Sequence, residues 1–190
     1  GSELVTGLNT RNQSLIWTDN AVHAMEFVGP PFIFNFRQLG SNCGISGQHA
    51  AIELDGRIFW MGAKDFFVYD GAVKALPCTV RRYVYDDFNF DQKEKVYAGT
   101  NQEFREVTWL YPSKNATEVD RYVSYNPVEN YWTFGTTIFT TWEDKEVFQN
   151  VITTGRESDG DNYLYTNEPE GIYTADGQRQ EAFLESSEFD

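Results

Sequence analysis

The 190-residue sequence contains only two cysteines, Cys43 and Cys78, with no CxxC pair and no set of histidine ligands beside them. Two isolated cysteines are too few for a disulfide framework or a zinc site. Neither lies in a recognisable nucleophile motif, so a thiol enzyme is not indicated. We therefore expect buried free thiols in a chain that folds in a reducing cytoplasm.

Long apolar runs and basic charge are also lacking. No stretch approaches the roughly 18 uninterrupted apolar residues of a membrane-spanning helix, so no membrane partner is expected. Fifteen basic side chains against twenty-nine acidic ones give a net charge of −14. Because clustered Lys and Arg drive binding to phosphates, this balance argues against a groove for nucleic acid.

Catalytic signatures are missing as well. The sequence has no G-x-S-x-G elbow, HExxH pair or P-loop. The adjacent acids Asp86-Asp87 and Glu143-Asp144 are poor acid/base pairs, since neighbours on a strand point to opposite faces. We expect no enzyme and assign no catalytic residue and no resident cofactor. One candidate Ca²⁺ site, formed by Glu157, Asp159 and Asp161, stands beside the simpler interpretation of a solvated turn.

Aromatic residues, in contrast, make up 16% of the chain. They occur in short runs with β-branched residues, broken by Gly, Pro, Asn and Asp, which is typical of strands and turns. The sequence therefore predicts an all-β fold, with strands at residues 49–54 and 79–85 among others. A single short helix is expected at residues 91–98, with Asp91 as N-cap and Gly99 just past its end.

An aromatic hairpin recurs along the chain. Its anchors are Trp17, Trp60, Trp109 and Tyr165, which are separated by 43, 49 and 56 residues. This spacing is close to the roughly 40 to 50 residues of a four-stranded propeller blade. We expect antiparallel sheets arranged like propeller blades, about four of them, with a β-sandwich as the alternative fold.

Two stretches carry a family resemblance: FVGPPFIFNFRQLGSNCGISGQHAAIELDGRIFWMGAKDFFVYDG and VKALPCTVRRYVYDDFN. They resemble tail structural proteins of tailed bacteriophages, of the β-propeller tail-tube terminus (nozzle, or tail tubular B-like) type. The resemblance runs from about Trp17 to Asp190. In that family the chain continues into further β domains, so we expect residues 3–190 to be one β domain excised from a longer protein. Residues 1–2 look like the remnant of a cleaved tag.

The resemblance implies a structural role without catalysis. Identical subunits would surround the tail axis of the virion and contact other tail proteins, while DNA passes through without specific binding. Residues 143–190 carry a net charge of −10, from thirteen acids and three bases. A negative surface facing the channel would repel the DNA phosphates.

The alternative function is a propeller module that binds a glycan or a host receptor. Trp and Tyr side chains on loops suit stacking against sugars, provided that they are exposed. The candidate rings are those of Trp109, Tyr111, Tyr131, Trp132 and Trp142. Burial of these rings between sheets would instead indicate that they are part of the scaffold.

Overall fold

The computed structural model describes residues 3–10, 13–144, 150–156, 160–167, 174–175 and 178–179. These residues fold mainly into four antiparallel sheets, which we number in chain order. The first sheet contains β1 (Leu4–Asn9), β2 (Ser14–Thr18), β3 (Ala21–Gly29) and β4 (Ile33–Ser41). The second contains β5 (Ala51–Leu54), β6 (Arg57–Met61), β7 (Phe66–Tyr69) and β8 (Val73–Ala75).

The third sheet contains β9 (Tyr97–Asn101), β10 (Glu106–Tyr111), β11 (Arg121–Asn126) and β12 (Tyr131–Thr136). The fourth contains β13 (Phe139–Glu143), β14 (Ile152–Arg156) and β15 (Asn162–Thr166), and β16 (Thr174–Ala175) pairs with β17 (Gln178–Arg179). Within each sheet, every strand pairs with the next one along the chain. The predicted all-β class is confirmed.

Local turn chemistry explains these hairpins. The loop between β5 and β6 is the dipeptide Asp55-Gly56, with φ of 52° and 75°. Two consecutive residues at positive φ form the type I′ turn, whose twist matches that of the flanking strands and which favours Asp-Gly. The sequence of this turn therefore sets the register in which Leu54 pairs with Arg57.

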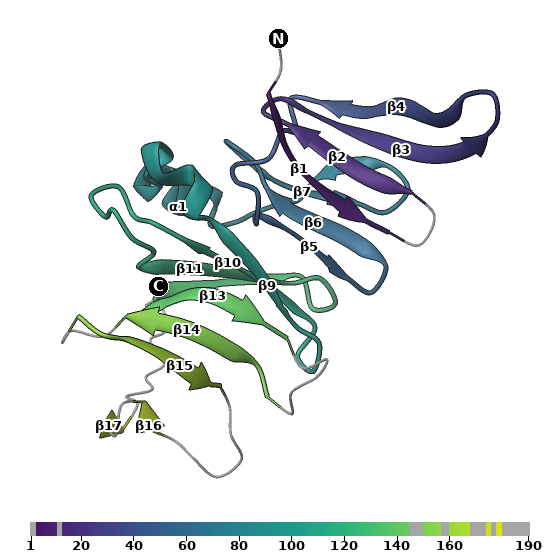
Figure 1. The fold of residues 1–190 in the computed structure, drawn as a ribbon. Helices are drawn as coiled ribbons and strands as arrows, with labels where there is room; N and C mark the ends of the chain where they lie inside the picture. Colours follow the sequence, from purple (N-terminus) through teal and green to yellow (C-terminus); the bar gives the residue numbers. More distant parts are fainter. Residues whose placement is uncertain are drawn as a thin grey trace.

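The sheets stack face to face in chain order (Figure 1). Between the first two sheets, Trp17 meets Trp60 edge to face at a centroid distance of 5.5 Å. Between the second and third, Phe66 lies 4.8 Å from Trp109. The first strands of the later sheets also meet, since β9 contacts both β5 and β13. This succession of sheets differs from a two-sheet sandwich.

Indole hydrogen bonds join the second, third and fourth sheets to earlier parts of the chain. Trp60 Nε1 donates to the carbonyl of Cys43, in the connection from the first sheet, at 2.9 Å. The corresponding bonds run from Trp109 to Ala50 (3.1 Å) and from Trp142 to Thr100 (2.7 Å). Each tryptophan thus fills an intersheet gap and satisfies a backbone carbonyl there.

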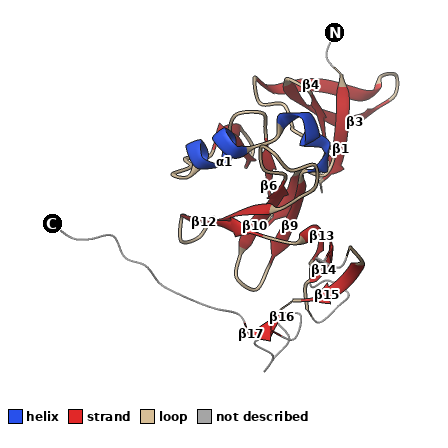
Figure 2. Cartoon of the chain, turned by 90° about the vertical axis from the view of Figure 1, so that its left-hand side faces the viewer, coloured by secondary structure: helices blue, strands red, loops and turns tan. Residues whose placement is uncertain are grey.

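The helix prediction is confirmed only in part, because a 3-10 helix overlaps the expected segment 91–98 and the α-helix lies elsewhere. The α-helix, α1 (Arg81–Asp87), occupies a segment expected to be a strand, and a 3-10 helix covers Phe90–Lys95. Both lie at one side of the sheets (Figure 2). Burial explains the difference, because Val80, Val84 and Phe88 recur every four residues and pack on the core.

The predicted helix boundaries also shift. Asn89, rather than Asp91, caps the 3-10 helix, since its side chain accepts from Asp91 N at 3.1 Å. The helix ends at Lys95 because the following residues join the third sheet, where Tyr97 pairs with Leu110 and Gly99 pairs with Thr108. Strand pairing therefore overrides the local helical preference.

The hairpin repeat is only partly regular. Trp17, Trp60 and Trp109 occupy equivalent positions, each on the second strand of its sheet, which agrees with the recurrence of the hairpin. Tyr165 departs from it, because this residue lies on β15, the third strand described in its sheet. Trp17 packs toward the sheet that follows it, whereas Trp109 packs toward the one before, so the anchors do not share one face.

Candidate interaction surface

The first sheet is covered on one face and open on the other. Leu15 and Trp17 of β2 are fully buried against the second sheet. Side chains alternate along a strand, so the residues between them face away from the protein. We call this the outward face; within the described part of the chain, it carries on β2 to β4 the side chains of Ser14, Ile16, His23, Met25, Phe27, Phe34, Phe36 and Gln38.

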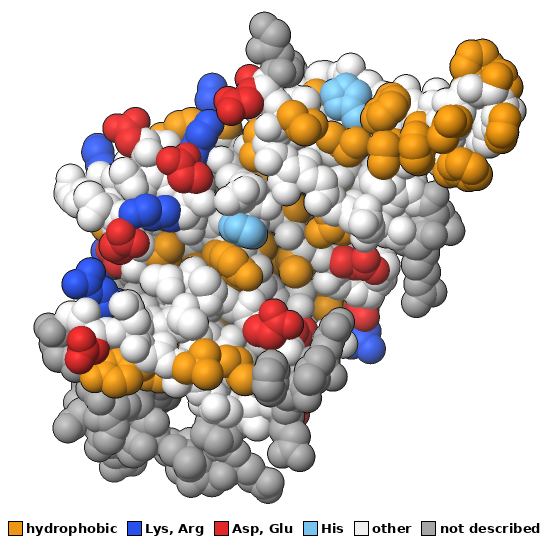
Figure 3. Space-filling model, in the orientation of Figure 1, with side chains coloured by type: hydrophobic (Ala, Val, Ile, Leu, Met, Phe, Trp, Pro, Cys, Tyr) orange, Lys and Arg blue, Asp and Glu red, His pale blue; other side chains and the backbone are white. Residues whose placement is uncertain are grey.

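The strand register aligns these residues across the sheet. Ser14 pairs with Met25, which pairs with Phe36, so the three lie in a row on one face. Farther out, Phe27 pairs with Phe34, and their rings meet edge to face at 5.9 Å. The outward face thus continues from the body of the sheet along the β3–β4 hairpin, where apolar side chains reach the tip (Figure 3).

The hairpin exposes a large apolar area. Phe27, Phe32, Phe34 and Phe36 are 71%, 79%, 48% and 61% exposed. These fractions add up to about two and a half fully exposed phenylalanine residues, which is roughly 500 Å² of apolar surface at ~200 Å² for each residue. The largest patch on a typical monomer is about 300–600 Å² and is often functional, so these four rings alone reach that size. Covering them would contribute on the order of 12 kcal/mol before the cost of association.

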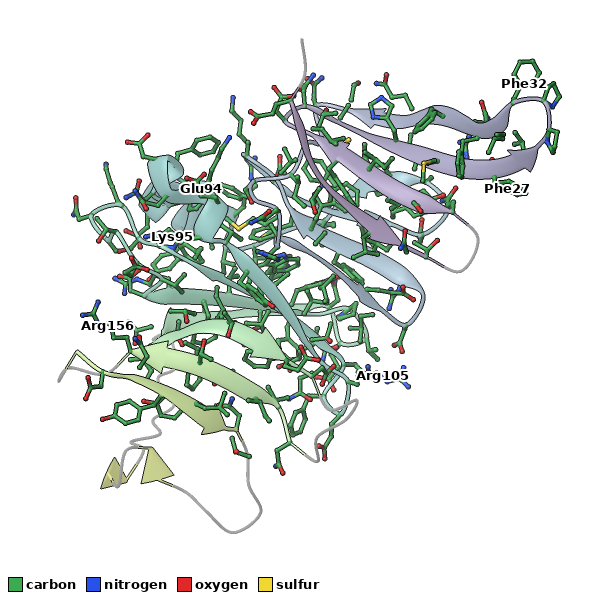
Figure 4. The ribbon with its side chains drawn as sticks, in the orientation of Figure 1. Phe27, Phe32, Glu94, Lys95, Arg105 and Arg156 are labelled. Carbon is green, nitrogen blue, oxygen red and sulfur yellow. The ribbon has the colours of Figure 1, made fainter. Side chains whose placement is uncertain are left out.

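The tip of the hairpin has an unusual backbone. Ile33 lies at φ 55°, in the left-handed region that β-branched residues rarely adopt. Phe34 N donates to Phe32 O at 2.5 Å across it, which forms a γ-turn. In Figure 4, Phe27 and Phe32 lie at the far end of the hairpin and point away from the body of the protein. Such backbone conformations often occur at functional sites.

The opposite side of the hairpin is polar. Glu26 pairs across the strands with Asn35, and Arg37 pairs with Ala24. The Arg37 guanidinium lies 3.3 Å from the Glu26 carboxylate, and both side chains are well exposed. The hairpin stem is therefore amphipathic, with rings on one side and an ion pair on the other.

The aromatic residues proposed as glycan contacts lie mostly in the core. Trp109 and Tyr111 are fully buried, so neither meets the condition of exposure. Trp132 is half-buried, with its ring stacked 4.5 Å from Tyr125. Trp142 is half-buried over β9, and Tyr131 alone is exposed, with its hydroxyl donating to Glu106 at 2.9 Å. The structure does not bring these five rings together on an exposed surface.

Of the Ca²⁺ candidates, Glu157 and Asp159 lie outside the described residues, and Asp161 follows a turn before β15. Among the residues that the structure describes, no cluster of His, Cys, Asp or Glu is arranged to hold a metal ion. Asp86 and Asp87 end α1, where each forms an ion pair with an arginine. These acids have a structural explanation.

A shallow hollow of about 260 Å³ lies where the first strands of three sheets meet. His49 stacks on Tyr97 at 5.2 Å there, and Lys95 forms an ion pair with Glu118 at 2.7 Å. Lys95 and Glu118 satisfy each other, and Glu94 is the other charged residue in the described lining, so the hollow offers few polar groups for a ligand.

Both cysteines are free thiols, as the sequence predicted, with Cys43 buried and Cys78 half-buried. Burial raises the pKa of the Cys78 thiol to about 11 and also raises the pKa of Cys43. Because the thiolate is the reactive form, neither residue is activated as a nucleophile.

No protein-family model matches the chain, and comparison with curated proteins finds no match to its sequence. No helix among the described residues is long and apolar enough to cross a membrane. The β3–β4 hairpin was not singled out from the sequence. Its signal was present in FVGPPFIFNF, ten consecutive residues without a charge and with only one polar side chain, that of Asn35.

Proposed function

We propose that the protein is a structural component of a bacteriophage tail, in which copies assemble around the tail axis without catalysing a reaction. The observation that carries this proposal is the uncovered outward face and its projecting hairpin. An apolar patch of this size is often a surface that contacts a partner. A scaffold subunit uses such a surface to bind its neighbours.

We further propose that the four sheets are blades of a β-propeller. Three features support this assignment: the strands of each sheet follow chain order, the sheets pack face to face, and β9 lies between β5 and β13. In a propeller the first strand of each blade lies near the axis, so successive first strands become neighbours. About four blades fall within these 190 residues.

The acidic segment 143–190 would face the channel in this proposal and repel the DNA phosphates. Most of the segment after residue 167 lies outside the described residues, so this part of the proposal rests on the sequence. A map of the electrostatic potential on the assembled ring tests it. Acidic groups directed away from the channel would contradict it.

The protein would fold in the host cytoplasm and then join the virion, in contact with other tail proteins. Mass spectrometry of purified particles tests this location, and electron microscopy of the full-length protein tests the ring. We expect the peptide in particles at several copies and a ring or tail-tip density. A full-length protein that is monomeric and missing from purified virions would overturn the proposal.

The glycan-binding alternative has less support. Its candidate rings are divided between the core and separate surface positions, and Tyr131 is the one that is exposed. Sugar recognition by stacking requires rings that share an accessible face. Specific binding on a glycan array, lost on Tyr131→Ala, would favour this alternative over the scaffold.

A further inference from the structure

We propose that the outward face is the contact between two copies of this chain, with the first sheet of one copy lying face to face on that of the other. This contact goes beyond the proposed ring, because one face meeting itself joins two copies, whereas a ring around an axis needs contacts between two different faces. It uses the outward face and the β3–β4 hairpin.

The amphipathic stem of the hairpin selects a protein partner over a lipid one. Phe27, Phe34 and Phe36 lie on the outward side, whereas Glu26 and Arg37 form an ion pair on the other side. Immersion in a bilayer would remove that ion pair from water, at considerable cost. Docking by one face buries the rings and leaves the ion pair hydrated.

The charge distribution favours a second copy at this face. Each chain carries a net charge of −14, so two copies repel one another over most of their surface. The outward face contains no Asp, Glu, Lys or Arg, and its charged neighbours Glu26 and Arg37 neutralise each other. Two copies therefore approach here with the least repulsion. Depletion of charge with enrichment of Phe and Met is also typical of interface cores.

The chain already uses the same packing internally. Its second and third sheets interlock through aromatic rings, with Phe59 lying 6.4 Å from Tyr125 and Phe66 lying 4.8 Å from Trp109. The outward face offers the same type of surface, a twisted sheet bearing phenylalanine and methionine. A second first sheet has the complementary composition and fits the usual sheet spacing of about 10 Å.

The available area agrees with a reversible dimer. The four exposed rings contribute roughly 500 Å² on each copy, and the half-exposed Ile16 and Met25 add to them. Two copies would together bury somewhat more than 1,000 Å², which is the lower end of the range for specific interfaces. We therefore expect association that depends on concentration in the 190-residue chain.

Sedimentation equilibrium of the 190-residue chain over a range of concentrations tests the proposal. The double variant F34S/F36S removes two outward rings, and the matched control E26Q/R37Q changes the opposite side of the same two strands. We expect a dimer in the parent chain, a rise of roughly tenfold or more in its Kd in F34S/F36S, and little change in the control. Circular dichroism checks that each variant is folded, and Phe27→Ser replaces the double variant if that one is not.

Three results would overturn the inference. These are a parent chain that stays monomeric, a dimer that F34S/F36S leaves intact, and a monomer that instead binds phosphatidylcholine vesicles through the hairpin. The proposed function fails separately. A dimer through the outward face in a protein that is missing from virions would refute the tail assignment alone, and a virion protein whose copies meet elsewhere would refute the inference alone.

Discussion

The contact between Gly99 and Trp142 provides a quantitative test of the stacked architecture. A Cβ atom added to Gly99 of β9 would lie 2.1 Å from Cγ and 2.3 Å from Cδ1 of Trp142 on β13. Gly99→Ala must therefore displace the indole, which also donates to Thr100 O at 2.7 Å. Overpacking costs about 1–3 kcal/mol and the lost hydrogen bond about 1 kcal/mol. We expect the free energy of unfolding to fall by about 2–4 kcal/mol.

Equilibrium urea unfolding, followed by circular dichroism and tryptophan fluorescence, measures this change. Gly7→Ala is the matched control, because its added Cβ would lie 3.4 Å from Leu15 O, an ordinary contact on an exposed strand. We expect its effect to be within about 0.5 kcal/mol. In a Trp142→Ala background the indole is gone, so Gly99→Ala should cost about 2–4 kcal/mol less than in the parent chain.

Additive losses of stability from Gly99→Ala and Trp142→Ala would refute the predicted contact between these two residues. If Gly99→Ala costs the same with and without the indole of Trp142, the two residues are not in contact and the third and fourth sheets do not stack through them. A cost below about 0.5 kcal/mol in the parent chain would lead to the same conclusion.

Two further predictions concern the tryptophans and the thiols. Trp60→Phe leaves the Cys43 carbonyl without its donor, whereas Trp17→Phe removes an indole N–H that has no protein partner. In urea unfolding, Trp60→Phe should therefore lower the free energy of unfolding by about 1–3 kcal/mol more than Trp17→Phe does. Equal losses in the two variants would contradict this difference. Burial raises the pKa of Cys78 from 9.0 to about 11, so the folded state holds this proton more tightly than the unfolded chain. The stability that this difference contributes is fully present below pH 9 and is lost as the pH rises to 11. The urea midpoint of the parent protein should therefore fall between pH 9 and 11, and that of Cys78→Ser should fall less. An identical fall in both proteins would contradict the raised pKa of Cys78.

Features that depend on neighbours in the sequence were predictable. The all-β class follows from aromatic runs separated by turn residues, and the Asp55-Gly56 turn has the backbone that its dipeptide favours. The equivalent positions of Trp17, Trp60 and Trp109 also agree with their recurrence along the sequence. The helix was misplaced because residues 79–85 have strand propensity, and a buried face at every fourth residue overrides it.

The interaction surface shows the limit of sequence reasoning most clearly. The charge-free run at residues 27–36 is visible in the sequence, but its exposure is not, because a buried strand can have the same composition. Conversely, Trp109 and Tyr111 seemed suited to a ligand and are in fact buried. Burial depends on which sheets lie on either side, and that is a long-range property.

The sequence by itself determined the all-β class, the Asp55-Gly56 turn and the tandem order of the hairpins, because backbone preference and side-chain alternation act over a few residues. Only the tertiary structure decided which faces are covered. The second and third sheets have neighbours on both sides, so their aromatic residues form the core. Among the described residues, the first sheet has a neighbour on one side alone, so the same kind of side chain is left exposed there.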